Sequence, residues 1–176
     1  MAIISPVSDL RNYNTVLEQV SAGSPVYLTV NGRGRFTIRD IADDEEFEKA
    51  KAMLRLMCEL NTGIRSGEEE GWVSEDSPVA VRDLERVWAE VFEASASEET
   101  ATKYVDDLMN QISAKQNFSK SGAPLYYEGL FTGFYFVTFK SYMAFYKVET
   151  DRMLVSRVVY GKSDYMRTIF RNTHKK

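Results

Sequence analysis

The segments FYFVTF (134–139), YMAFYKV (142–148) and MLVSRVVY (153–160) decide the fold class of this chain. Each is rich in aromatic and β-branched residues, which favour β-strands. The turns between the segments are short, at Lys140-Ser141 and Glu149–Arg152. The sequence therefore predicts an antiparallel three-stranded meander whose Tyr and Phe side chains form a sheet core packed under helices.

Two amphipathic helices are predicted before this meander. Apolar residues at helical spacing indicate the first at Leu84, Val87, Trp88, Val91 and Phe92, and the second at Ala101, Tyr104, Val105, Leu108, Met109 and Ile112. The short polar stretch 94–99 between them favours an antiparallel helical hairpin. Residues 115–129 are interpreted as a loop. The second half is thus expected to be an α+β domain, in the order α–α–β–β–β, with the hairpin packed on an antiparallel sheet.

The first half of the chain has a different pattern. Ser8-Asp9 is typical of a helix start, and apolar residues follow at helical spacing until Gly23. Residues 25–30 and 35–38 are strand-like, and Asn31-Gly32 between them is a hairpin turn because both residues tolerate positive φ. The acidic run 43–46 begins a second helix. Its apolar face is expected to be Phe47, Ala50, Leu54, Met57 and Cys58. The predicted order is α–β–β–α.

Residues 62–77 separate the two patterns. They contain Gly63, Gly67 and Gly71 and the run Glu68–Glu70, without a sustained apolar period, which predicts a break in secondary structure. We therefore expect a first domain at 1–61, a tail or linker at 62–76 and a second domain at 77–176. Domains this small bury a thin core, so each is expected to depend on a partner for stability.

The net charge of −4 is unevenly distributed. Residues 40–76 carry four basic and twelve acidic residues, whereas residues 152–176 carry seven basic residues and one acidic residue. An acidic middle and a basic end in one chain suggest that the first covers the second. Two separately solvated surfaces are the alternative.

Several classes of protein are disfavoured by composition. No apolar run is long enough to span a bilayer, and the N-terminus lacks the pattern of a signal peptide, so we expect a cytoplasmic protein without a membrane partner. The single cysteine, Cys58, is expected to be a core thiol in a reducing compartment. The single histidine, His174, makes a Ser-His-Asp arrangement improbable. No Cys/His spacing fits a metal site, and no cofactor is expected.

Two sets of cations remain as candidate binding groups. Arg11, Arg33, Arg35 and Arg39 are the basic residues among the first 48, and such a set could contact DNA phosphates. The second set follows the last predicted strand or lies on it: Arg152, Arg157, Lys162, Arg167 and Arg171. Nearby tyrosines could add base stacking, as in RNA-binding sites. Arg157 is the most unusual, because it interrupts the apolar run 154–159. Ordinary surface charge is the alternative for both sets.

The stretches ISPVSDLRNY (4–13), PVYLTVNG (25–32) and GWVS (71–74) resemble the N-terminal domain and tail of Phd/YefM antitoxins. In that family the N-terminal domain dimerises and binds operator DNA, and the acidic tail wraps the cognate toxin. The family's first-helix arginine matches Arg11, which is followed by Asn12. A second family arginine, before the hairpin, has no counterpart, and Arg33 and Arg35 are the candidates to replace it. The resemblance thus implies DNA binding by Arg11, Asn12, Arg33 and Arg35.

The stretches SPVAVRDLERVW (77–88), YMAFYKV (142–148), RVVYG (157–161) and DYMRTIF (164–170) resemble RelE/ParE toxins. Some members cleave mRNA by positioning the ribose 2′-OH and stabilising the phosphorane charge with Arg and Lys, and gyrase-directed members are not nucleases. The resemblance implies catalytic candidates at Arg157, Lys162, Tyr165 and Arg167.

Three family features are altered in this second half. An arginine common near the first meander strand is replaced around Tyr135, and Asp164 stands where the YoeB-like branch has a histidine before the tyrosine. Family members usually open with a strand before the first helix, and in this sequence only residues 71–76 are available to form it.

Together the two resemblances predict a toxin–antitoxin fusion. Its antitoxin part would dimerise, bind operator DNA for autorepression and neutralise the attached toxin part. The alternatives are an active or latent ribosome-dependent mRNA endonuclease, a gyrase-directed ParE-like toxin, and a degenerate toxin that acts as a corepressor. The expected partners are a second copy of the chain, operator DNA, and ribosome-bound mRNA or DNA gyrase.

Overall fold

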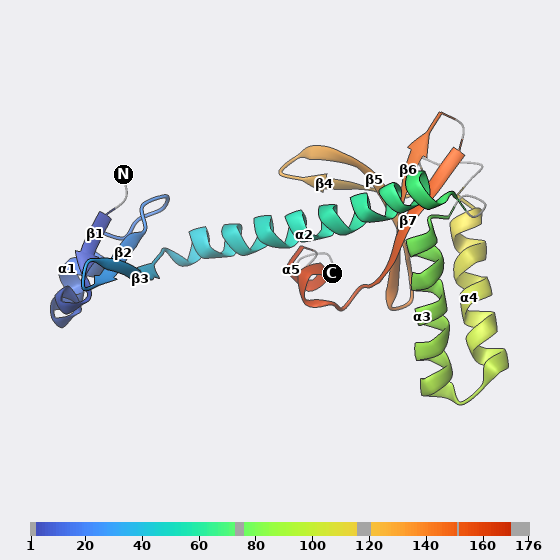
Figure 1. The fold of residues 1–176 in the computed structure, drawn as a ribbon, viewed down its shortest axis with the longest axis horizontal. Helices are drawn as coiled ribbons and strands as arrows, with labels where there is room; N and C mark the ends of the chain where they lie inside the picture. The colour runs from blue at the N-terminus through green and yellow to red at the C-terminus, as the bar shows by residue number, and fades with distance from the viewer. Residues whose placement is uncertain (1–2, 73–75, 116–120, 151, 170–176) are drawn as a thin grey trace. The chain divides into compact units, whose positions relative to one another are not determined.

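The computed structural model describes residues 3–72, 76–115, 121–150 and 152–169 (Figure 1). The chain divides into two compact units, residues 1–51 and 52–176, and each is described by itself. The fold is mixed α and β, as the sequence predicts: a small sheet lies in the first unit, and helices pack on an antiparallel sheet in the second. Among the described residues, no helix is both long and apolar enough to cross a membrane.

The first unit is a small three-stranded sheet with a short helical segment. Its strands are β1 (Ile3–Pro6), β2 (Val26–Val30) and β3 (Arg33–Ile38), with β1 parallel and β3 antiparallel to β2. The predicted first helix is a 3-10 turn, η1 (Val7–Asn12), followed by α1 (Tyr13–Leu17). Strand β1 was not predicted, because Ile3–Pro6 is too short to show an alternating pattern.

The hairpin turn of the first unit has the predicted geometry. Asn31 and Gly32 both have positive φ, at 52° and 75°, as a two-residue turn between right-twisted strands requires. The buried core of this unit consists of Val16, Val26 and Leu28. Such a core is small for a unit of this length, so much of its apolar surface faces solvent.

Helix α2 (Ile41–Glu70) is longer than the sequence indicates. The predicted break at residues 62–77 is wrong over its first nine residues, which continue the helix. Gly63 and Gly67 interrupt the apolar pattern because the backbone there packs closely: a Cβ on Gly63 would lie 2.1 Å from the Ser156 carbonyl oxygen, and one on Gly67 would lie 2.4 Å from the Trp72 indole. These glycines allow close packing and do not end the helix.

The buried face of α2 also differs from the predicted one. Met53, Leu56 and Leu60 are buried, whereas Phe47 and Leu54 are exposed. Ala50 and Cys58 are exposed as well, so the expected core thiol is wrong, and of the predicted face Met57 alone is partly buried against the core. Apolar residues occur on both sides of α2, and the sequence pattern alone favours the wrong side.

The second unit contains a four-stranded antiparallel sheet in the order β4-β5-β6-β7. The strands are β4 (Ala123–Tyr127), β5 (Leu130–Phe139), β6 (Tyr142–Glu149) and β7 (Arg152–Tyr160). The last three form the predicted meander. Strand β4 corrects the predicted loop at 115–129. It pairs with β5 at Ala123, Pro124, Tyr126 and Tyr127, and the turn between the two strands lies at Glu128 and Gly129, both at positive φ.

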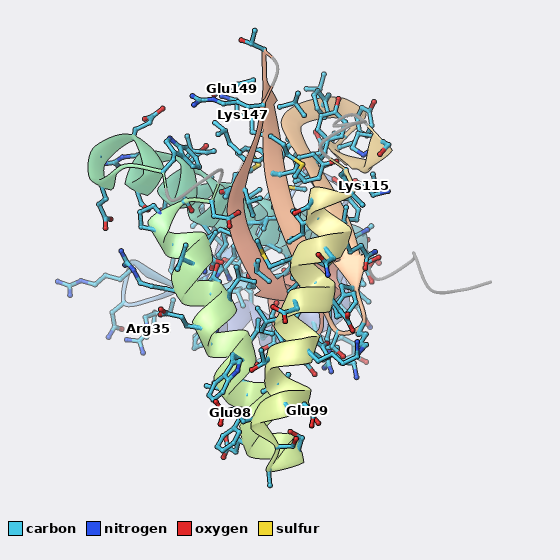
Figure 2. The ribbon with its side chains drawn as sticks, turned by 90° about the vertical axis from the view of Figure 1, so that its right-hand side faces the viewer. Arg35, Glu98, Glu99, Lys115, Lys147 and Glu149 are labelled. Atoms are coloured by element: carbon cyan, nitrogen blue, oxygen red, sulfur yellow. The ribbon has the colours of Figure 1, made fainter. Side chains whose placement is uncertain are left out.

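One face of this sheet carries the predicted helical hairpin (Figure 2). It consists of α3 (Pro78–Ser95) and α4 (Glu98–Ser113). Ala96 in the left-handed conformation ends α3, and the Ser97 side chain caps α4 by accepting from the Thr100 amide. Two acidic residues, Glu98 and Glu99, follow in the first turn of α4, where the positive end of the helix dipole favours them.

The other face of the sheet is covered as well, which the sequence did not predict. Tyr142, Ala144 and Tyr146 of β6 face the hairpin, whereas Met143 and Phe145 face the opposite side, following the two-residue period of a strand. On that opposite side lie the C-terminal half of α2 and Met166 of the short helix α5 (Asp164–Ile169). The sheet is therefore buried between two helical layers.

Residues 71–76 were expected to replace the opening strand of RelE/ParE toxins, and the structure describes residues 71, 72 and 76 of this segment. Asp76 forms a parallel bridge with Val155, and the Ser77 amide donates to the Val155 carbonyl at 3.0 Å. Residues 73–75 lie outside the described residues. A short chain segment thus runs beside the free edge of β7 just before α3.

Candidate functional site

A β-bulge at Ser156 organises the candidate site. Phe145 pairs with Arg157 and Tyr146 pairs with Val155, so Ser156 is the extra residue on β7. Its carbonyl accepts from the Ser77 hydroxyl at 2.9 Å, and its own hydroxyl donates to the Leu60 carbonyl at 2.5 Å. A bulge bends a strand and redirects the neighbouring side chain. Here it joins α2 and the start of α3 to β7 immediately before Arg157.

Arg157 is held by Asp83 of α3. The Arg157 Nε donates to Asp83 Oδ2 at 2.6 Å, and Nη2 lies 3.3 Å from Oδ1. The same carboxylate accepts from the Val158 amide at 3.0 Å and from Arg86 at 2.9 Å. Both side chains are largely buried, with 4% of Asp83 and 14% of Arg157 exposed. Buried charges require such pairing, so this contact fixes α3 on the edge of β7.

A second carboxylate reaches Arg157 from α2. Glu59 Oε2 lies 3.6 Å from Arg157 Nη1 and accepts a hydrogen bond from the Tyr165 hydroxyl at 3.0 Å. Its other oxygen lies 3.7 Å from the Nε of Arg55, whose guanidinium also stacks 5.3 Å from the Tyr165 ring centre. Glu59 is 26% exposed and therefore more accessible than Asp83. α2, β7 and α5 thus meet at one carboxylate.

Burial and neighbouring charges shift the pKa values of two groups at the site, Arg157 and Tyr165. Burial alone would lower the pKa of Arg157, but Asp83 and Glu59 outweigh burial and raise it. Burial, followed by the charge and hydrogen bond of Glu59, raises the pKa of Tyr165 to about 12. At neutral pH the arginine is therefore a fixed cation, and the tyrosine is a hydrogen-bond donor that does not ionise.

The structure brings together two of the four catalytic candidates. Arg157 and Tyr165 share Glu59, whereas Lys162 and Arg167 are exposed. Within the described ranges, no hydrogen bond or ion pair joins Lys162 or Arg167 to that pair. Of the other tail cations, Arg152 is exposed near Glu149, and Arg171 lies outside the described residues.

The four DNA-binding candidates are all exposed in the first unit. Arg11 and Asn12 lie on η1, and Arg33 and Arg35 lie on β3, with Arg35 labelled in Figure 2. Arg39 differs from them, because its guanidinium stacks on the Phe47 ring at 4.7 Å. The candidates come from two elements, and in the described part of the chain no hydrogen bond or ion pair connects η1 side chains with those of β3.

Two residues of the site were missed by sequence reasoning. Asp83 carried a usable signal, because an acidic residue adjoining Ala80, Leu84 and Val87 falls on the buried face of a helix and needs a cationic partner. Glu59 carried none, because it is one acid among twelve in residues 40–76. As for metals, no group of three His, Cys, Asp or Glu side chains in the described residues is placed to hold an ion.

Comparison with known proteins gives one family. Residues 77–165 match the family model of the ParE toxin of the type II toxin–antitoxin system parDE. Among solved structures, the chain is similar to the chromosomal ParDE toxin–antitoxin system of P. aeruginosa, with 21% identity and a TM-score of 0.40 over 47% of this chain and 88% of that one. No curated protein matches. The matched residues include α3, α4, the whole sheet, Asp83, Arg157 and Tyr165, and the chain therefore belongs to the family of ParE toxins of type II toxin–antitoxin systems.

Proposed function

We propose that this protein is a fused toxin–antitoxin, in which residues 1–61 and their tail to residue 76 form a Phd/YefM-like antitoxin joined to the ParE-type toxin domain at 77–176. The antitoxin part dimerises, binds operator DNA to repress its own synthesis, and silences the toxin. The observation that carries the silencing is the docking of α2 on the second face of the sheet, where Glu59 engages Arg157 and Tyr165.

The docked half of α2 has the properties of a covering segment. Met53, Leu56 and Leu60 are 4%, 0% and 0% exposed, and they pack against Phe145, Val159 and other residues of the sheet face. Burying side chains of this size contributes about 1.5–3 kcal/mol each as an upper estimate. Because α2 is covalently attached, its effective concentration at the sheet is high and the covered state is favoured.

Self-association of the first unit is supported by its exposed apolar side chains. Large hydrophobic residues on several elements remain exposed: Ile4, Leu10, Tyr13, Leu17, Phe36, Ile41 and Phe47. With a buried core as small as Val16, Val26 and Leu28, this unit gains most from covering that surface with a second copy. The resemblance to Phd/YefM antitoxins implies the same partner.

DNA binding is supported by the exposure of the candidate cations. Arg11, Arg33 and Arg35 have free access to solvent, and a dimer would present each of them twice. Phosphate contacts by such arginines make binding depend on salt, and contacts to base edges add sequence preference. The operator is therefore expected to contain two half-sites that reflect the two-fold symmetry of the dimer.

Of the alternative activities, the family match favours the ParE-like branch. The matching family is named for ParE, and the resemblance noted in the sequence implies DNA gyrase as the target of that branch. A RelE-like mRNA endonuclease would use Arg157 at the phosphate, but Asp83 inside the family domain already engages its Nε and Nη2. A degenerate toxin that serves as a corepressor is the remaining alternative.

Toxicity of three chains tests the silencing. The full chain, residues 52–176 with the docked half of α2, and residues 77–176 without it are expressed from the same inducible promoter. We expect growth arrest from residues 77–176 alone, because the other two chains retain the cover. Arrest by residues 52–176 would refute silencing by α2. Normal growth with soluble, folded 77–176 would favour the corepressor alternative, and mRNA integrity and plasmid supercoiling in arrested cells separate the two toxin branches.

A further inference from the structure

The contacts of Arg157 fall into two groups with different origins. Asp83 engages Nε and Nη2 from α3, inside the family domain, and is fixed by the Val158 amide and Arg86 as well. Glu59 engages Nη1 from α2, outside the family domain. Asp83 is therefore part of the frame of the toxin domain, whereas Glu59 reaches the domain as a ligand would.

The position of Glu59 is that of an anion in a binding site. One oxygen, Oε2, lies 3.6 Å from Arg157 Nη1 and 3.0 Å from the Tyr165 hydroxyl, so a cation and a neutral donor converge on one atom. Asp83 binds Nε and Nη2 of Arg157, which leaves Nη1 for the contact with Glu59. The ion pair with Arg157 and the hydrogen bond from Tyr165 together make the two residues a site for an anionic oxygen.

The surroundings favour a carboxylate over a phosphate as the ligand. Beside the two donors lies the apolar face made by residues including Phe145, Val159 and Met166, on which Leu56 and Leu60 of α2 rest. Phosphate sites usually offer several cations. Lys162 and Arg167 are exposed, and within the described ranges no hydrogen bond or ion pair joins them to the pair. Arg55 lies 3.7 Å from the other oxygen of Glu59, but it belongs to α2 and leaves with that helix. Outside α2, one cation, one hydroxyl and an apolar floor suit an amphipathic helix that carries an acidic side chain.

We propose that Arg157 and Tyr165 form a carboxylate-binding site that Glu59 fills in the intact chain. A role of this site in controlling the toxin rests on the function proposed above, in which α2 silences the toxin domain. A segment that displaces α2 must then present a carboxylate in the place of Glu59. An acidic amphipathic segment of another protein is the kind of partner that competes with α2. The binding chemistry itself does not depend on whether the toxin domain is toxic.

Anion rescue of the full-length Glu59→Ala variant tests the site. The apolar contacts of α2 remain in this variant, and the removed carboxylate leaves space for a free one. Sodium acetate or formate at about ten times its dissociation constant should raise the melting temperature of the second unit by about 3 °C relative to sodium chloride at equal ionic strength. The double variant Glu59→Ala with Tyr165→Phe should lose most of this rise.

The control is Glu69→Ala, which removes an exposed glutamate of the same helix that pairs with Arg65. Neither this variant nor the wild type should respond to acetate more than to chloride. An equal response of Glu59→Ala and Glu69→Ala would overturn the site, and a response of Glu59→Ala to inorganic phosphate without one to acetate would overturn its assignment to a carboxylate. If Glu59→Ala does not fold, Glu59→Ser leaves similar space, and the same outcomes apply to it. Because the readout is melting temperature, failure here is distinct from a failed toxicity test.

Discussion

Gly63 of α2 lies directly against the backbone carbonyl of Ser156 at the bulge of β7. A Cβ built on Gly63 would be 2.1 Å from that oxygen and 2.6 Å from the Ser156 hydroxyl oxygen. Both obstacles belong to a bulge that is also bonded to Ser77 and Leu60, so they cannot move aside freely. The close approach of α2 to the toxin sheet at this point therefore depends on a residue without a side chain.

Replacing that glycine should weaken the docking of α2. We expect Gly63→Ala to lower the free energy of unfolding of the second unit by about 2 kcal/mol, since overpacking outweighs the gain in helix propensity. Urea denaturation followed by circular dichroism measures the loss. The matched control is Gly34→Ala in β3, where nothing lies within 4 Å of the added Cβ. A Gly63→Ala protein as stable as the wild type would contradict the close packing.

Removing Arg157 should destabilise the toxin domain even though the residue was a catalytic candidate. Arg157→Ala leaves Asp83 buried without its main partner, and breaking such a pair costs about 3–5 kcal/mol. In a double-mutant cycle, adding Asp83→Ala should restore part of the loss. For comparison, Arg82→Ala breaks the exposed pair with Glu70 and should cost less than about 1 kcal/mol. If the losses of unfolding free energy in Arg157→Ala and Asp83→Ala simply add in the double variant, the two residues are not coupled.

Tyr165 should make stability depend on alkaline pH. Its pKa is raised from 10 to about 12 in the folded chain, so the folded state holds the phenolic proton more tightly than the unfolded state does. This contribution is fully present below pH 10 and is lost as the pH rises towards 12. The stability of Tyr165→Phe should therefore fall less steeply across this window than that of the wild type, measured as unfolding free energy against pH.

The control for this experiment is Tyr126→Phe, which removes the hydroxyl of an exposed ring on β4. It should follow the wild-type curve. Burial also raises the pKa values of Tyr104, Tyr142 and Tyr146, so part of the alkaline loss remains in every variant. Identical curves for Tyr165→Phe and the wild type would contradict the role assigned to Tyr165.

Charging the exposed apolar surface of the first unit should abolish self-association. We expect the wild type to sediment as a dimer, and Leu17→Glu with Phe36→Glu to shift it to a monomer, because both side chains are about half exposed within one chain. Analytical ultracentrifugation measures the change. Leu130→Glu at the tip of the β4–β5 hairpin is the control, since its 75% exposed side chain lies in the other unit. A monomeric wild type would refute the dimer.

Operator binding should weaken in proportion to the phosphate contacts that are removed. If Arg33 and Arg35 each contact a phosphate, each replacement by alanine should reduce the slope of log K against log salt by about 1. Gel shifts with the protein's own promoter at several salt concentrations measure this slope. Arg65→Ala, on the exposed side of α2 in the second unit, is the matched control. An unchanged slope for both hairpin variants would exclude them from the DNA interface.

The elements with strong local periodicity were predicted well from the sequence. The α3–α4 hairpin and the β5–β6–β7 meander have long apolar patterns that do not depend on distant residues. The course of α2 was not predictable in this way. Gly63 and Gly67 indicate a helix break unless one knows that Ser156 and Trp72 occupy the space beside them, which is a property of the tertiary fold.

The candidate site was predicted in part for the same reason. Arg157 was conspicuous because it interrupts an apolar strand, and a charge in such a position needs a partner. The partners Asp83 and Glu59 lie 74 and 98 positions earlier in the sequence, and no local pattern connects them with Arg157. Sequence reasoning thus located the cation but not the carboxylates that define its chemistry.

Because α2 is part of the same chain as the sheet that it covers, the ratio of cover to covered surface cannot change. The covering helix and the surface that it covers belong to one polypeptide, so every molecule carries them in a fixed ratio of one to one, whatever the rates of synthesis and degradation. When a cover is a separate molecule, dilution or its faster turnover exposes the surface. When it is built into the chain, opening is a unimolecular step, and the exposed fraction is independent of protein concentration. Exposure of Arg157 and Tyr165 is then governed by the combined strength of the intramolecular contacts of α2 and by whatever competes for them.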